Sequence, residues 1–404
     1  MKKRKTHFGP GILVTAAFIG PGTLTVCTIA GVQSGMTLLW ALLLSILITI
    51  FIQNIAARIS WTSGKGLAEV VHQQTQHVFL RWSLLGLILL AIFLGNAAYE
   101  GGNISGAILG IRQFVRLPPY AIGSLTVDFL PLIIGVLVGF LLWWGSIRLL
   151  KNILISIVLV MSVSFLITAI MTQPDWIAFF RGLFLPKVDT ENVFLVVAIL
   201  GTTIVPYNLF LHAALVKKER HLYTDFSELK KDTFISVGFG GLISLCIVIA
   251  ASASGLESVN SAADLGKAIA PLYGKYAEVL IGIGLFAAGI SSAMTAPIAA
   301  GYVVSECLGW KGAMGNQRSK GVALVVLAIG VLFASLQIKP IEVIRIAQLA
   351  NGLLLPVVGL FLFWVLSQKK MQNEYRHFLW VRICLSLIIC FFIFLALKTL
   401  GLFS

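Results

Sequence analysis

The run VFLVVAILGTTIVPYNLFLHAALV, residues 193–216, is long and apolar enough to cross a bilayer as a helix, yet it contains Val205-Pro206-Tyr207-Asn208 near its middle. Proline has no amide hydrogen to donate, and its ring clashes with the preceding turn, so we expect the helix to break there. A second apolar run, residues 9–34, is interrupted in the same way by Gly20-Pro21-Gly22. Paired broken helices are typical of transporters that are built from two inverted repeats and bind substrate near the midplane of the membrane.

The alternative is that these prolines only kink ordinary helices, which is common in membranes. The two prolines occupy corresponding positions in the two halves of the chain, which favours a pair of broken helices over two unrelated kinks. On this interpretation the chain is a single membrane transport domain, residues 1–404, with repeats at about 9–172 and 193–367 and an extra helix at about 378–401.

The composition places the whole chain in the membrane. Hydrophobic residues make up 58% and charged residues 11%, and the mean hydropathy is +0.96, whereas soluble domains have roughly 25% charged residues. Because lipid cannot satisfy backbone polar groups, we expect an all-α membrane protein with about eleven transmembrane helices. The predicted spans are 9–34, 36–57, 83–110, 121–145, 152–172, 193–216, 233–254, 276–305, 320–336, 340–367 and 378–401.

The basic residues predict the orientation. With the N-terminus inside, most of the 30 Lys and Arg residues fall in cytoplasmic segments. We therefore expect a cytoplasmic N-terminus, an external C-terminus and a place in the plasma membrane. The net charge of +14 is dispersed among short loops, which favours contact with anionic lipids over nucleic acid. The basic start at Lys2–Lys5 also resembles a signal peptide, but the apolar run continues without an obvious cleavage site.

The first candidate site consists of the two breaks. Gly20, Gly22 and Thr23 leave backbone amides and carbonyls unpaired, and such groups need a ligand, water or another polar partner. In the second break, Thr202, Thr203, Tyr207 and Asn208 add hydroxyl and amide groups at the same expected depth, and Val205 is a further candidate for contact with the substrate. Together they predict a polar cavity without formal charge.

Two ionisable residues within the spans are candidates for ion coupling. Glu100 is the only acidic residue deep inside an apolar stretch, where a charge is costly unless it has a partner, water or a proton. His212 follows the second break and can change charge near physiological pH. For each of them, a structural hydrogen bond is the alternative. Gly102, Gly106 and Gly110 recur every four residues, which predicts close helix packing.

The order of several motifs resembles the Nramp family of proton-coupled divalent metal transporters, which has the leucine-transporter-type fold. The resemblance covers nearly the whole chain. It rests on these stretches: Thr62-Ser63-Gly64-Lys65-Gly66-Leu67-Ala68-Glu69, Pro174-Asp175-Trp176, Gly182-Leu183-Phe184-Leu185-Pro186, Pro206-Tyr207-Asn208-Leu209-Phe210-Leu211-His212, Gly284-Leu285-Phe286-Ala287-Ala288-Gly289, Ser291-Ser292, Gln348 and Pro356.

The chain departs from the family pattern at the metal ligands that the resemblance implies. The first break carries Gly20-Pro21-Gly22-Thr23 instead of Asp-Pro-Gly-Asn, and the second carries Val205-Pro206-Tyr207 instead of Met-Pro-His. The family's carboxylate, amide and thioether ligands are therefore missing. The resemblance retains Thr202, whose backbone carbonyl would be a ligand. The acidic and histidine positions of the family are retained as Glu100 and His212, whereas Ala97 replaces an aspartate and Ile290 a glutamine.

Three functions remain open. The first is transport of a metal or hydrated cation, coupled to protons or another ion, with Thr23, the Thr202 carbonyl and Gln348 around the ion; Thr23 and Thr202 are the most that the breaks offer a metal. The second is symport of a small carboxylate or amino acid, held by Gly20–Thr23, Tyr207 and Asn208. The third is a sensor or assembly subunit without transport. We expect neither an enzyme nor a bound cofactor, because the sequence shows no nucleophile with a base and no phosphate loop, and its cysteines lack paired spacing.

Overall fold

The structure, a computed structural model, describes residues 19–75, 77–115, 117, 120–122, 125–144, 148–188, 191–310, 316–336, 338–368 and 378–402. Nine helices in this part of the chain are long and apolar enough to cross a membrane. The shorter apolar helix α6 and the half-helix α2 bring the total to the eleven predicted spans. The prediction of a helical membrane protein is confirmed; residues 9–18 of the first span lie outside the described residues.

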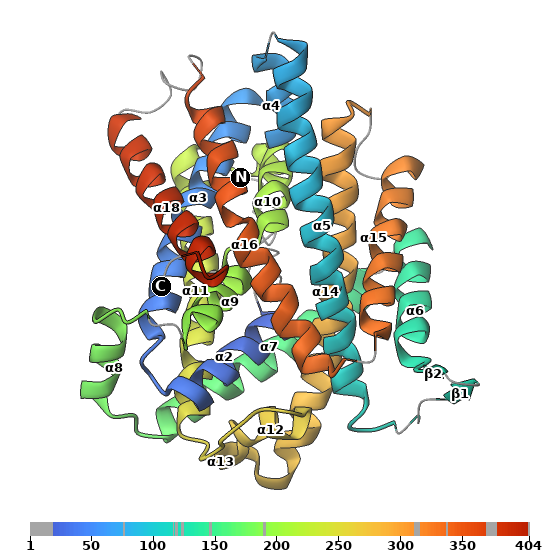
Figure 1. The fold of residues 1–404 in the computed structure, drawn as a ribbon, viewed down its shortest axis with the longest axis vertical. Coiled ribbons are helices and arrows are strands. Elements are labelled where there is room, and N and C mark those ends of the chain that lie inside the picture. The colour runs from blue at the N-terminus through green and yellow to red at the C-terminus, as the bar shows by residue number, and fades with distance from the viewer. Residues whose placement is uncertain are drawn as a thin grey trace, which may run out of the picture.

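The helices that correspond to the predicted spans are α2 (Pro21–Ser34), α3 (Leu39–Ser63), α5 (Val78–Ile111), α6 (Leu130–Trp144), α7 (Arg148–Met171), α9 (Val193–Thr203) with α10 (Pro206–Glu219), α11 (Phe226–Ser252), α14 (Ala277–Cys307), α15 (Gln317–Ser335), α16 (Pro340–Leu366) and α18 (Phe378–Thr399). Between them lie α4 (Leu67–Gln74), α8 (Trp176–Phe184), α12 (Ala262–Lys267), α13 (Ala270–Tyr273) and the 3₁₀ turns η1 (Arg220–Leu222) and η2 (Gly274–Tyr276). Helix α4 lies at one end of the molecule, and α12 and α13 lie at the opposite end (Figure 1).

One predicted span is wrong at its start. Residues 121–129 were expected to be helical, but β1 (Tyr120–Ile122) and β2 (Leu125–Val127) pair as a short antiparallel hairpin. Helix α6 begins only at Leu130, whose amide donates to Asp128 Oδ1 over 3.1 Å. Asp128 also pairs with Arg112 beyond the end of α5. Charged groups such as these are favourable where the protein meets water. The backbone is not restricted to helix there, because water can satisfy its polar groups.

Other helix ends extend beyond the apolar runs. Helix α3 continues to Ser63 and α11 already starts at Phe226. Asp225 caps α11, since its Oδ1 accepts from the Glu228 amide over 2.9 Å. Such caps satisfy the free amides at the start of a helix. Helices can therefore include polar residues at their ends, and a hydropathy window does not assign these residues to the span.

Helix α5 packs against three other helices through its glycine stripe. A methyl group added at Gly106 would overlap the ring of Pro21 at the start of α2. Additions at Gly102 and Gly110 would meet α16 and α14 respectively. The prediction that the stripe serves helix packing is confirmed, and it brings α5 against the first break.

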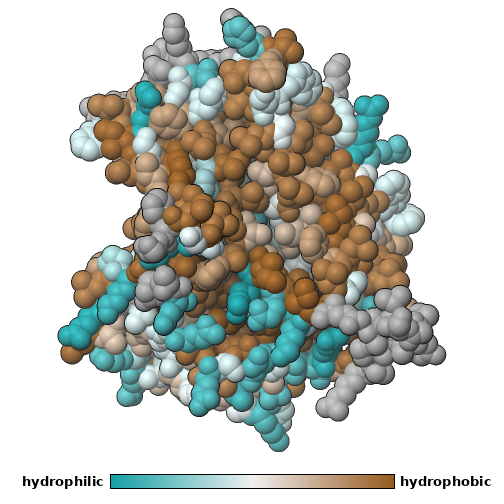
Figure 2. Space-filling view, viewed as in Figure 1, coloured by the Kyte–Doolittle hydropathy of each residue, from teal (hydrophilic) through white to brown (hydrophobic). Residues whose placement is uncertain are grey.

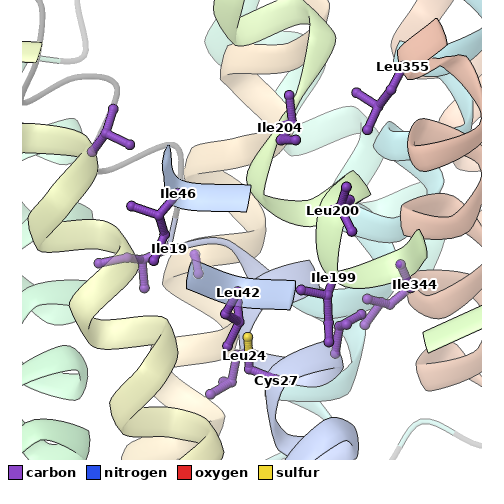
Figure 3. Packing of buried hydrophobic residues seen from close by; sticks show 14 of the residues in the cluster. Ile19, Leu24, Cys27, Leu42, Ile46, Ile199, Leu200, Ile204, Ile344 and Leu355 are labelled. Atoms are coloured by element: carbon purple, nitrogen blue, oxygen red, sulfur yellow. The ribbon is translucent and has the colours of Figure 1, made fainter. Parts of the chain in front are cut away.

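The surface and the core are both predominantly apolar. Figure 2 shows hydrophobic side chains over the upper and middle parts of the visible face and hydrophilic side chains in its lower part. Branched side chains from α2, α3, α9 and α16 pack in the interior (Figure 3). These apolar side chains surround the two breaks. A polar group at a break therefore relies on the residues next to it for hydrogen bonds.

Candidate functional site

The second break separates α9 from α10. Helix α9 ends at Thr203, Val205 is extended with φ −83° and ψ 118°, and α10 begins at Pro206. The Thr202 carbonyl would receive its helical hydrogen bond from the residue four positions later, which is Pro206 and has no amide hydrogen. The break therefore frees the carbonyl that the resemblance assigned to a ligand.

The described side of the first break resembles the start of α10. Gly20 is extended, with φ −97° and ψ 178°, and α2 begins at Pro21. The first intrahelical bond runs from the Leu24 amide to the Gly20 carbonyl over 3.2 Å. The Gly22 amide precedes this bond, and amides in the first turn of a helix have no intrahelical acceptor.

The two breaks lie side by side. Thr23 Oγ1 and Thr202 Oγ1 are 3.0 Å apart, although 179 positions separate them in the sequence. Both side chains are buried. The predicted meeting of the breaks is thus confirmed by a direct hydrogen bond between them.

Helix α16 lies against both breaks at Gln348. A methyl group at Gly22 would overlap the Gln348 side chain, and one at Gly201 would overlap the Gln348 backbone carbonyl. Conversely, a methyl group at Gly352 would overlap the Val197 carbonyl of α9. The absence of side chains on these glycines lets α16 approach so closely that Gln348 reaches the junction of α2 and α9.

Several buried polar atoms near the start of α10 and along α16 have unused hydrogen-bonding capacity. Asn208 Nδ2 and Oδ1, Gln348 Oε1 and Asn351 Nδ2 make no hydrogen bond to another described residue. All three side chains are at most 2% exposed. Leaving such groups unpaired costs roughly 1–3 kcal/mol each, so they favour the binding of a polar ligand or water.

Tyr207 follows the second break and contacts α5. Its ring meets that of Tyr99 edge to face, with centroids 5.3 Å apart. Val205 packs in the same small buried cluster, which also includes Ala296 and Ala299 of α14. Where the family pattern has the methionine and the histidine of Met-Pro-His, this chain therefore has an apolar and aromatic contact.

Glu100 lies next to this cluster on α5. It is wholly buried; its Oε2 accepts from Asn103 Nδ2 over 3.2 Å, and its Oε1 has no partner among the described residues. Gly330 of α15 packs directly on its side chain. Glu100 is close enough to Tyr207 to interact with it electrostatically, so this buried carboxylate borders the second break.

His212 faces α11. Its Nε2 lies 3.4 Å from Thr233 Oγ1, and its Nδ1 makes no hydrogen bond to a described residue. The imidazole is wholly buried. The structure places it on α10, beyond Tyr207, and its coupling role stays a prediction.

Within the described residues, no group of three or more His, Cys, Asp or Glu side chains could hold a metal ion. The polar groups at the breaks are hydroxyls, carbonyls and carboxamides. A cation there would be bound by neutral oxygens, with Glu100 as the nearest acid identified.

The sequence analysis missed several residues of this region. Tyr99 was not recognised as the partner of Tyr207, nor Asn351 as a buried amide three positions after Gln348. Asn96, which donates to the Ala296 carbonyl over 3.3 Å, was also missed. The i, i+3 spacing of Gln348 and Asn351 on one helix face was the available signal.

Comparison with known proteins identifies the family. The profile described as "Nramp: Natural resistance-associated macrophage protein-like" matches residues 11–401. A "Metal transporter nramp1 homolog" of Dictyostelium discoideum is 30% identical over 346 residues, which is 80% of this chain; the match covers 61% of that protein, so this chain spans less than two thirds of it. The "Divalent metal cation transporter MntH" of Deinococcus radiodurans is 26% identical over 88% of this chain and 80% of its own length.

Solved structures support the fold. A manganese transporter of Eremococcus coleocola superposes with a TM-score of 0.74 at 21% identity, covering 97% of this chain and 85% of its own. Mhp1, a nucleobase-cation-symport-1 family transporter, superposes with a TM-score of 0.57 at 12% identity, covering 98% and 90%.

The eleven-helix plan and the paired breaks define a multi-pass integral membrane protein with the leucine-transporter-type fold. Within that class, the chain belongs to the Nramp family. The resemblance noted from the sequence motifs is confirmed.

Proposed function

We propose that this protein carries a divalent cation across the plasma membrane, bound at the two breaks by neutral oxygens while the ion keeps part of its water shell. The observation that carries the proposal is the meeting of the breaks at Thr23 and Thr202, beside a carbonyl that Pro206 leaves without a donor. Relatives named as divalent metal transporters support the substrate class.

The ligand chemistry favours a hard, hydrated ion. Magnesium binds oxygen atoms, dehydrates reluctantly and usually keeps several waters, so it needs few direct ligands. The Thr202 carbonyl, the Thr23 hydroxyl and Gln348 Oε1 are suitable oxygens, and Asn208 supplies another. Softer metals favour sulfur or imidazole, which Val205 and Tyr207 do not supply. We expect Mg²⁺ and Mn²⁺ to be carried in preference to Zn²⁺ or Cd²⁺.

The same proposal includes proton coupling through Glu100 and, farther along α10, His212. Glu100 is buried beside Tyr207, and its Oε1 has no hydrogen-bond partner within the residues that the structure describes. A carboxyl group in that position can exchange a proton as water or a cation arrives and leaves. Coupling through this residue would act on the second break by way of Tyr207.

Uptake into proteoliposomes tests the proposal. Vesicles with the purified protein should accumulate Mg²⁺ or Mn²⁺ faster than empty vesicles, and an inward proton gradient should increase the rate. Thr23→Val should weaken uptake, whereas Thr399→Val, which removes a hydroxyl at the end of α18, should not. Failure to carry any divalent ion under either gradient would overturn the proposal.

A small carboxylate or amino acid is the second candidate substrate. The amides in the first turn of α2 direct a positive dipole toward the break, and neither polar atom of the Asn208 carboxamide makes a hydrogen bond to another described residue. A thermal-shift screen separates the candidates: stabilisation by carboxylates but not by divalent ions would favour the organic solute. A chain without transport, acting as a sensor or assembly subunit, would show neither uptake nor such binding.

A further inference from the structure

The end of the molecule at α4 contains a buried carboxylate outside the site described above. Glu306, near the end of α14, is only 5% exposed. Its Oε1 accepts a hydrogen bond from the hydroxyl of Tyr302, one turn earlier on α14. Its Oε2 makes no hydrogen bond to a side chain in the described part of the chain. A carboxylate buried so deeply needs further partners from neighbouring elements.

These partners belong to the start of α4. The Glu306 carboxylate lies directly over Gly66, where an added methyl group would overlap both of its oxygens. The amide of Ala68, in the first turn of α4, also faces the carboxylate. A helix start presents unpaired amides and a partial positive charge, so a negative group is favourable at this place.

Two further contacts tie α4 to its neighbours. Lys217, in the last turn of α10, donates to Glu69 Oε2 of α4 over 2.6 Å. On the other side, His72 Nε2 lies 2.6 Å from the Cys307 carbonyl and donates to it. Helix α4 is thus held to α10 by an ion pair and to α14 by Glu306 and His72.

The contacts around α4 are linked to the two breaks through α10, because α10 is the second half of the broken helix. Its first residue, Pro206, starts at the break, and its last turn carries Lys217. A passage that opened between these helices at the α4 end would separate α4 from α10 and α14. The contacts that hold the three helices together oppose such an opening.

We propose that Glu306 is a positioning residue for transport: its carboxylate, seated on Gly66, holds the α4 end of the passage shut, and its release opens that end. If the helices separated, water would reach the carboxylate and offset the loss of its contacts with Tyr302 and α4. The net contribution of a buried charge to stability is small, because its desolvation opposes its contacts. Such a contact can therefore form and break reversibly. The inference rests on the proposed transport function and concerns access to the same site.

Cys307 provides a built-in reporter of this opening. Its thiol is wholly buried next to Glu306, and Cys27 of α2 is equally buried far along the chain. A maleimide can react with a buried thiol only when the surrounding structure opens. Labelling of the full-length protein in detergent, followed by mass spectrometry of each cysteine, measures the opening at α4 without any substrate.

We expect Glu306→Ala to speed Cys307 labelling by roughly tenfold while Cys27 stays protected, because labelling follows the population of the locally open state. Glu306→Gln should lie between this variant and the wild type, since an amide keeps one acceptor oxygen. Gly66→Ala should act like Glu306→Ala, because the new methyl group displaces the carboxylate without changing it.

Two matched variants serve as controls. Gly86→Ala adds a methyl group to α5 where no atom lies within 4 Å, and Glu342→Ala removes a half-exposed glutamate from the first turn of α16. Both should leave Cys307 labelling at the wild-type rate. Equal protection of Cys307 in Glu306→Ala and Gly66→Ala would overturn the inference, as would parallel labelling of Cys27, which indicates general loosening.

The result separates the two proposals. Vesicles that carry no divalent ion would end the metal-transport proposal but would not change the labelling of Cys307. Conversely, unchanged labelling would end the role of Glu306 even if uptake is observed.

Discussion

The middle of the molecule and its α4 end differ in how their polar groups are paired. At the breaks, the identified groups are neutral, and Asn208 and Gln348 keep atoms that make no hydrogen bond to another described residue. At the α4 end, charged groups contact neighbouring helices: Lys217 of α10 pairs with Glu69 of α4, and the Glu306 carboxylate of α14 lies over Gly66 at the start of α4. The difference indicates that the middle is arranged to receive a ligand, whereas the α4 end is arranged to hold itself together.

The largest effect is expected at Gly201, because the middle of the molecule depends on close packing of the α9 and α16 backbones at this glycine. Gly201→Ala places a methyl group on the Gln348 backbone carbonyl, which cannot move aside as a side chain can. We expect a loss of roughly 1–3 kcal/mol of folding stability, typical of overpacking, together with loss of uptake. The melting temperature in detergent and the uptake rate measure both. Wild-type stability would show that α16 does not need to lie so close.

Gly22→Leu should stop uptake while the protein still folds. The added side chain meets the flexible end of Gln348 rather than backbone, so the site is filled but the helices need not separate. Uptake should fall to the rate of empty vesicles, with a melting temperature near that of the wild type. Continued uptake would contradict a binding site at the first break.

Glu100→Gln tests whether the buried acid beside the second break serves coupling. The amide keeps the size of the side chain and the bond to Asn103 but cannot release a proton at neutral pH. We expect uptake driven by a pH gradient to be lost and substrate binding, measured by thermal shift, to be largely kept. An unchanged pH dependence would remove Glu100 from the coupling route.

Thr23→Val should weaken substrate binding moderately. The change removes the hydroxyl that meets Thr202 but keeps the branched shape of the side chain. The loss of one hydrogen bond, about 0.5–1.5 kcal/mol, corresponds to roughly a two- to thirteenfold weaker affinity. The concentration dependence of uptake measures this change, with Thr399→Val as the control.

The smallest effect is expected at the α4 end from Glu69→Gln. Lys217 and Glu69 are 36% and 34% exposed, and exposed ion pairs contribute only about 0–1 kcal/mol. Substrate affinity should therefore stay unchanged, and the melting temperature should move little. A marked loss of affinity would mean that the two regions do not have separate roles.

Much of the fold could be predicted because its signals are local. Apolar runs of membrane-crossing length predicted the membrane-spanning helices of the described residues, and Pro206 marked the start of a half-helix. The paired strands Tyr120–Ile122 and Leu125–Val127 were missed, because a hydropathy average over Leu125 to Val127 does not distinguish strand from helix. The division into repeats at 9–172 and 193–367 and the orientation of the termini remain predictions.

The candidate site was predictable only in part. Gly20, Thr23, Thr202, Tyr207 and Asn208 were found because they adjoin the prolines, and the close packing of the breaks followed from symmetry between the halves. Their roles in binding remain proposals. The partners Tyr99 and Asn351 come from other helices, and no local pattern connects them to the breaks.

The sequence by itself determined that this chain is a membrane protein and where its helices break, because hydropathy and proline geometry are properties of short segments. Tertiary structure alone decided that Thr23 meets Thr202, that Gln348 reaches both breaks, and that Glu306 rests on Gly66. Those contacts join distant positions through glycines that let helices approach, and such distances follow from packing rather than from any one segment.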